Sequence, residues 1–238
     1  MMTPLNLLEL IKDAYTLSKE FDTLIGMVNV PTPTNLKKQY AIIRSELEEV
    51  IDSCVAKDYE GLRDGILDVL KTVIGLYTLN GWVPNISLAD ITEHDLTVDD
   101  YRELYLISLE MNEDLIRLEE GKPLEVSSAD YLLVQTLVMV CKADIEGLFD
   151  YHQMHLGLMS RFDSSMENAL LTKDYYATSD VETYIESTEV DGVMWYCNKL
   201  KSSQMVKGRL EVAGKMMKSK FFSEPDYTDS ASGIHFAK

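Results

Sequence analysis

The segment from Arg44 to Trp82 constrains the fold most strongly, because it contains two helical patterns joined by a short polar turn at residues 57–59. The second pattern is apolar on nearly every side, with Ile66, Leu67, Val69, Leu70, Val73, Ile74, Leu76, Tyr77 and Leu79. A helix that is apolar nearly all round belongs in a protein interior. Consecutive helices with a short connection become antiparallel neighbours. The sequence therefore predicts an antiparallel helical core built around this hairpin.

Four carboxylates follow the helical spacing of the same hairpin. Glu46 and Glu49 lie three residues apart in the first helix, and Asp64 and Asp68 lie four apart in the second. Residues at these spacings share one face of a helix, so all four side chains could converge. Converging carboxylates need a counter-charge, which Mg²⁺ or Mn²⁺ would supply. The alternative is a solvated acidic face, favoured at the start of the second helix by the helix dipole.

The order of these acids resembles the all-α nucleoside triphosphate pyrophosphohydrolases, the MazG and dimeric dUTPase superfamily. Residues 46–52 match its ExxE motif and the apolar pair that follows, and residues 64–70 match its ExxD motif and apolar helix. One position departs from that pattern, since Gly65 stands three residues before Asp68, where the family has Glu. The resulting D-G-x-x-D sequence is similar to that of bacteriophage members.

This resemblance implies hydrolysis of (deoxy)nucleoside triphosphates to the monophosphate and pyrophosphate, in control of the nucleotide pool of a phage-infected cell. The implied cofactor is Mg²⁺, with Mn²⁺ as the alternative, held by Glu46, Glu49, Asp64 and Asp68. The metal would lower the pKa of a bound water, and Glu49 or a neighbouring carboxylate would take the proton as the catalytic base. Lys71 would either neutralise an acid or meet a substrate phosphate.

Two basic islands interrupt the acidic C-terminal part of the chain. Ser160 and Arg161 form one, and Lys215 and Lys218 lie in the other, ahead of a Pro-Asp pair at 225–226. They resemble the N-M-S-K and G-K-x-x-K…P-D motifs of phage MazG-like proteins, with Leu158 in place of the Asn. We expect these four residues to bind the triphosphate. The alternative is that they form salt bridges with the protein's own acids.

The helical patterns suggest a repeated architecture. Residues 5–27, 101–119 and 131–149 show helical spacing, the last capped by Ser127 or Ser128. In the second half, the ExxE and acid-Gly-x-x-acid patterns recur, so a functional role stays open for Glu110, Glu113, Glu146 and Asp150.

We expect a helical catalytic domain over residues 1–162, with 1–84 and 98–158 as candidate duplicates, and a C-terminal α/β extension over 163–238 that completes the substrate site. Apolar alternation and glycine around residues 181–200 predict a β-hairpin in this extension. The expected fold class is mainly α, an antiparallel helical bundle of the all-α nucleoside triphosphate pyrophosphohydrolase type with a small C-terminal β-hairpin region.

Composition bounds the partners. A net charge of −18 and a pI near 4.5 argue against nucleic-acid binding. Three scattered cysteines favour a reducing compartment, and we expect neither a signal peptide nor a membrane span, which places the protein in the cytoplasm, the host's if it is phage-encoded. The resemblance implies a homodimer or higher homo-oligomer. Alternatives are a catalytically inactive nucleotide-binding module and a helical protein-interaction module.

Overall fold

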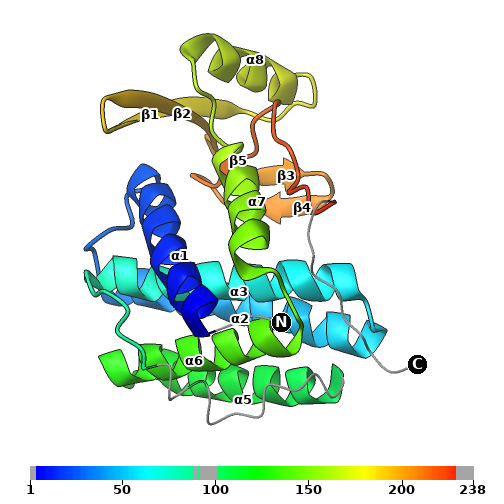
Figure 1. Cartoon of the computed structure of the whole chain (residues 1–238). Helices are drawn as coiled ribbons and strands as arrows, with labels where there is room; N and C mark the ends of the chain where they lie inside the picture. The colour runs from blue at the N-terminus through cyan, green and yellow to red at the C-terminus, as the bar shows by residue number, and fades with distance from the viewer. Residues whose placement is uncertain (1–3, 88–90, 92–100, 229–238) are drawn as a thin grey trace. The chain divides into compact units, whose positions relative to one another are not determined.

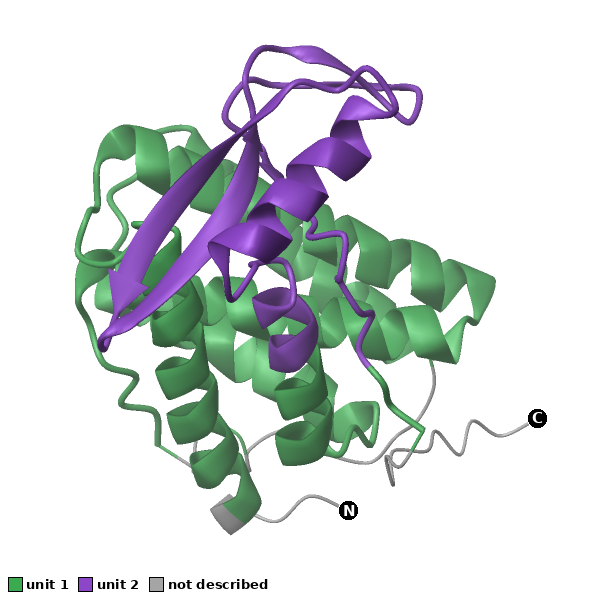
Figure 2. Cartoon of the chain, turned by 90° about the horizontal axis from the view of Figure 1, so that it is seen from above, with its two compact units in different colours: residues 1–154, 226–238 green, residues 155–225 purple. Residues whose placement is uncertain are grey.

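The computed structural model describes residues 4–87, 91 and 101–228. The chain forms two compact units, one of residues 1–154 with 226–238 and one of residues 155–225 (Figure 2). The expected boundary at 162/163 therefore lies inside the second unit, and the chain from Asp226 onward groups with the first. The described part of the chain is mainly helical with a small antiparallel sheet towards its C-terminus, which confirms the coarse fold class predicted from sequence.

The first unit is built from helices (Figure 1). They are α1 (Pro4–Leu24), α2 (Pro33–Ala56), α3 (Tyr59–Asn80), α5 (Tyr101–Glu119), α6 (Val126–Lys142) and the first part of α7 (Gly147–Met159). Helix α3 packs against α1, α2 and α6, while α5 packs against α2 and α6. Two helical hairpins, α2–α3 and α5–α6, are thus joined side by side. No helix among the described residues is long and apolar enough to cross a membrane.

The α2–α3 hairpin is defined by capping residues that the sequence makes visible. The Thr32 hydroxyl accepts a hydrogen bond from the backbone N of Asn35, at 3.2 Å, and Pro33 occupies the first turn of α2. Helix α3 begins at the side chain of Asp58, which accepts from the backbone N of Gly61 at 3.2 Å. It ends at Gly81, whose φ of 71° is a left-handed value that favours glycine. Gly81 is therefore the residue that ends α3.

Burial of α3 follows its sequence. All nine apolar residues that predicted an interior helix are at most 1% exposed. Because α3 is packed against α1, α2 and α6, most of its surface is buried, and the apolar run is the reason for its central place.

The single helix predicted over residues 131–149 is wrong. Helix α6 ends at Lys142 and α7 begins at Gly147. Between them Asp144 adopts a left-handed φ of 48°, and the backbone N of Ile145 donates to the carbonyl of Val140 at 3.1 Å, a helix-terminating turn. The predicted caps are also wrong, because Glu125 precedes α6 and the two serines lie inside its first turn.

The second unit contains α8 (Met166–Ala177) and five short strands. Strands β1 (Thr183–Val190) and β2 (Val193–Leu200) form the predicted hairpin, with Asp191 and Gly192 both at positive φ in its turn. Strand β5 (Met216–Met217) pairs with β2, and β3 (Gln204–Val206) pairs with β4 (Arg209–Glu211). The core of this unit is a cluster of Tyr176, Val181, Leu200 and Met217.

Candidate functional site

Two glycines of α3 show how closely α2 lies against it. A Cβ atom added at Gly65 would lie 3.0 Å from Cγ2 of Val50 and 3.5 Å from its backbone N. One added at Gly75 would lie 2.6 Å from Nε2 of Gln39, which donates to the carbonyl of Thr72 at 2.6 Å. The two contacts lie at opposite ends of the hairpin and fix its antiparallel register.

This register brings the two acidic motifs to the same level of the hairpin. Counting along the antiparallel helices from the Val50–Gly65 contact places Glu46 level with residue 69, one residue from Asp68, and Glu49 level with residue 66, two residues from Asp64. Glu46 and Asp68 are partly buried, whereas Glu49 and Asp64 are exposed. The backbone thus pairs ExxE with D-G-x-x-D, as the predicted site requires.

The side chains themselves are not gathered into a metal centre. Within the described residues, no three His, Cys, Asp or Glu side chains lie close enough together to hold a metal ion. The donor chemistry of the four acids suits Mg²⁺, which prefers carboxylate oxygen. Their backbone register suits a shared site as well, so what the structure lacks is a convergent set of side-chain conformations.

Asp64 has a partner that the sequence analysis missed. The hydroxyl of Tyr227, far along the chain, donates to Oδ1 of Asp64 at 2.9 Å. The ring of Tyr227 lies against the guanidinium of Arg63, whose Cζ is 4.2 Å from the ring centroid. Burial raises the pKa of Tyr227, and the nearby charges of Asp64 and Asp68 raise it further. The Pro-Asp pair just before Tyr227 was the available signal, because it marked this segment as part of a motif.

Lys71 neutralises an acid. Its Nζ lies 2.6 Å from Oδ1 of Asp22 in α1, and the other oxygen of Asp22 accepts from the hydroxyl of Thr78. Lys71 is 7% exposed and Asp22 is 4% exposed. The ammonium also lies 4.8 Å from the ring centroid of Phe21. Of the two roles expected for Lys71, neutralising an acid or meeting a phosphate, the structure shows the first, with Asp22 as the acid.

The four C-terminal residues expected to bind phosphate belong to the second unit, whereas the acids belong to the first. Lys215 lies 2.5 Å from Glu211, and Lys218 lies 3.1 Å from Glu224. Both lysines thus have ion-pair partners on the protein itself, as in the alternative interpretation. Lys215, Lys218 and Glu224 are exposed and Glu211 is partly buried, and ion pairs at such surface positions contribute little stability.

Ser160 and Arg161 lie just after α7. The hydroxyl of Ser160 donates to the carbonyl of Gly157 at 2.7 Å and accepts from the backbone N of Ser223 at 3.1 Å. The Nε of Arg161 is buried and has no hydrogen-bond partner among the described residues. The structure therefore joins the first basic island to the segment after the second, although they lie about 60 residues apart.

A buried polar cluster, which the sequence analysis did not single out, holds the same segments together. Oδ1 of Asp163 accepts from Ser219 at 2.5 Å and from Thr172 at 3.2 Å. These three side chains are at most 5% exposed. Asp163 also exchanges two backbone hydrogen bonds with Tyr196 of β2. The cluster fixes α8 and the C-terminal segment onto the sheet within the second unit.

The second acidic set does not reproduce the first. Glu110, Glu113 and Glu146 are exposed, whereas Asp150 is fully buried in the first turn of α7. Because α6 ends at Lys142, Glu146 and Asp150 do not lie on the same helix as the apolar run that precedes them. The sequence echo therefore does not extend to the geometry of the acids.

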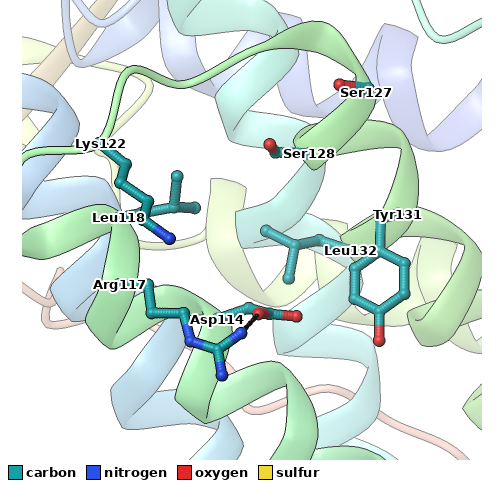
Figure 3. A pocket seen from close by; sticks show the side chains of 8 residues that line it. All are labelled: Asp114, Arg117, Leu118, Lys122, Ser127, Ser128, Tyr131 and Leu132. Atoms are coloured by element: carbon teal, nitrogen blue, oxygen red, sulfur yellow. Dashed lines mark hydrogen bonds and ion pairs between the residues drawn. The ribbon is translucent and has the colours of Figure 1, made fainter.

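A pocket of about 310 Å³ lies between the end of α5 and the start of α6 (Figure 3). Its two cations are Arg117 and Lys122, and Arg117 is paired with Asp114 at 3.0 Å. Burial, with Glu110 and Asp114 nearby, raises the pKa of Tyr131 in its wall to about 12. None of the residues predicted to form the site lines this pocket. Its lining residues are Asp114, Arg117, Leu118, Lys122, Ser127, Ser128, Tyr131 and Leu132.

Comparison of the chain with protein-family models, with curated proteins and with solved structures finds no match.

Proposed function

We propose that the chain is a divalent-cation-dependent nucleoside triphosphate pyrophosphohydrolase whose cation is held by the acids of α2 and α3. The observation that carries this proposal is the antiparallel register, which brings Glu46 within one residue of the level of Asp68 and Glu49 within two residues of the level of Asp64. The wider family assignment, including a homodimer or higher homo-oligomer, is part of the same proposal.

The residues of the hairpin have distinct expected roles. Glu46 and Asp68, which are partly buried, would hold the cation near the α2–α3 interface, with Asp64 and Glu49 completing the set from the exposed side. When bound, Mg²⁺ would offset triphosphate charge and lower the pKa of a water. Glu49, exposed on α2, would accept the proton of that water.

The same proposal includes contacts between the triphosphate and the second unit. The residues that would make them are Ser160, Arg161, Lys215 and Lys218. Lys215 and Lys218 would first have to leave Glu211 and Glu224. Because exposed ion pairs are weak, a triphosphate could replace the carboxylates as the partner of each ammonium.

A second candidate is a nucleotide-binding or partner-binding helical module without catalysis. The specific observation that favours it is the lack of any gathered group of three metal-ligating side chains in the described residues. The pairing of Lys71 with Asp22 also fits this candidate, since it removes one cation from the expected substrate contacts.

A panel of nucleoside triphosphates, including dUTP and dCTP, should be assayed with Mg²⁺ for pyrophosphate release. Glu49→Gln and Asp68→Asn should each lower kcat/KM by about 10²- to 10⁴-fold without changing the circular dichroism spectrum. Glu9→Gln, at an exposed acid of α1 outside the two motifs, is the control and should keep activity.

Thermal unfolding with and without Mg²⁺ separates the candidates. A site ligand raises the melting temperature by mass action. Stabilisation by Mg²⁺ and nucleotide without turnover would identify the inactive module. The absence of both stabilisation and turnover would leave only a helical scaffold.

A further inference from the structure

The segment 226–228 forms a turn that presents one side chain to α3. Oδ1 of Asp226 accepts hydrogen bonds from the backbone N of Thr228 at 3.0 Å and from its hydroxyl at 2.6 Å. These bonds close the turn and lower the pKa of Asp226. The residue at the centre of the turn is Tyr227, which is therefore held by local structure on both sides.

The ring of Tyr227 is held by Arg63. The guanidinium lies 4.2 Å from the centroid of the Tyr227 ring and 5.6 Å from that of Tyr59, and Arg63 is only 5% exposed. Its remaining charge partner is Glu60, one turn earlier in α3. A guanidinium packed on aromatic rings in a largely buried place is a favourable cation–π arrangement. Tyr227 consequently has little freedom to turn its hydroxyl elsewhere.

That hydroxyl is directed at an acid of the proposed site. It donates to Oδ1 of Asp64 at 2.9 Å. Asp64 is exposed, and an exposed carboxylate without a hydrogen-bond donor samples several rotamers. In metal sites, ligating carboxylates are commonly oriented by hydrogen bonds from residues that do not touch the metal.

We infer that Tyr227 is a positioning residue of the acid site, which orients the Asp64 carboxylate for the divalent cation through its hydroxyl and is itself held by Arg63. This inference rests on the function proposed above and adds to it a residue that neither acidic motif contains. It also gives the C-terminal segment a role in the first unit, with which that segment groups.

The test is titration of the full chain with Mn²⁺ by isothermal titration calorimetry, without nucleotide. Tyr227→Phe removes only the hydroxyl and should raise the Kd for Mn²⁺ by about 10- to 100-fold. Thr228→Ala, which removes one bond of the turn at an exposed position, should shift the Kd in the same direction and by less. Tyr101→Phe, which removes a hydroxyl that donates to the backbone carbonyl of Lys57 at 3.2 Å, is the control, and its Kd should match wild type.

The outcomes separate the two proposals. If wild type binds Mn²⁺ and Tyr227→Phe binds it equally well or more tightly, the positioning role is overturned while the metal site stands. If wild type does not bind Mn²⁺, the proposed function fails and this inference fails with it. Melting curves of each variant establish that a change in Kd does not come from unfolding.

Discussion

Among single residues, Lys71 and Asp22 form a buried charge pair of the first unit. The pair joins α3 to α1, and Thr78 completes the hydrogen bonding of the carboxylate. A buried pair of this kind is sensitive to loss of one partner, because the other charge is then left without compensation in a poorly solvated place.

Lys71→Met should therefore lower the free energy of unfolding by about 3–5 kcal/mol. The double variant Asp22→Asn with Lys71→Met should recover much of that loss, since no unpaired charge remains. Urea unfolding followed by circular dichroism measures both. If Lys71 instead serves the substrate, the single variant would keep its stability and change the KM for nucleotide.

At the scale of elements, the close contact of α2 and α3 gives a physical reason for a glycine at position 65. A Cβ atom at this position would lie 3.0 Å from Cγ2 of Val50. A Glu side chain there would have to enter the interface between the two helices. The acid beside it, Asp64, instead lies on the exposed side of α3.

Gly65→Ala should lower the free energy of unfolding by about 1 kcal/mol, because overpacking of about 1–3 kcal/mol exceeds the gain in helix propensity of about 1 kcal/mol. Gly65→Glu should cost more, since it adds a carboxylate to a buried interface. The sign should reverse in a Val50→Ala background, where the Cγ2 atom 3.0 Å from the new Cβ is gone. Denaturant unfolding of Gly65→Ala, Gly65→Glu, Val50→Ala and the double variant measures these free energies. If Gly65→Ala is destabilising in the Val50→Ala background as well, the contact with Val50 is not the cause.

On the scale of the whole molecule, buried weak acids make the fold sensitive to base. Burial raises the pKa of the Cys54, Cys141 and Cys197 thiols from 9.0 to about 11. Burial likewise raises the pKa of several phenols, among them Tyr40, Tyr77, Tyr151 and Tyr227. In each case the folded protein holds a proton that the unfolded chain releases more readily.

The stability contributed by these groups is complete below the unfolded pKa values of 9.0 for thiols and 10.0 for phenols, and is lost as pH rises through the folded values. The free energy of unfolding should consequently fall with increasing slope above pH 9. Urea midpoints at successive pH values test this, with tyrosinate absorbance recorded in parallel. Ionisation of all tyrosines near pH 10 with an unchanged midpoint would contradict it.

The local signals of the chain predicted its elements well where one short segment decides the outcome. The α2 and α3 boundaries follow from Thr32, Pro33, Asp58 and Gly81, and the β1–β2 hairpin follows from its glycine turn. The α6–α7 break was missed, because a left-handed Asp144 has no strong signature within an otherwise apolar helical pattern.

The sequence by itself determined the central helix, because a run with no polar side has only the interior to occupy, and it determined the spacing of the four acids. Only the tertiary structure decided which groups meet those acids. Tyr227 reaches Asp64 from the far end of the chain, and Lys71 turns to Asp22 on α1. Such pairings depend on how distant segments pack, and the periodicity of a single helix does not indicate which residues of other segments will contact it.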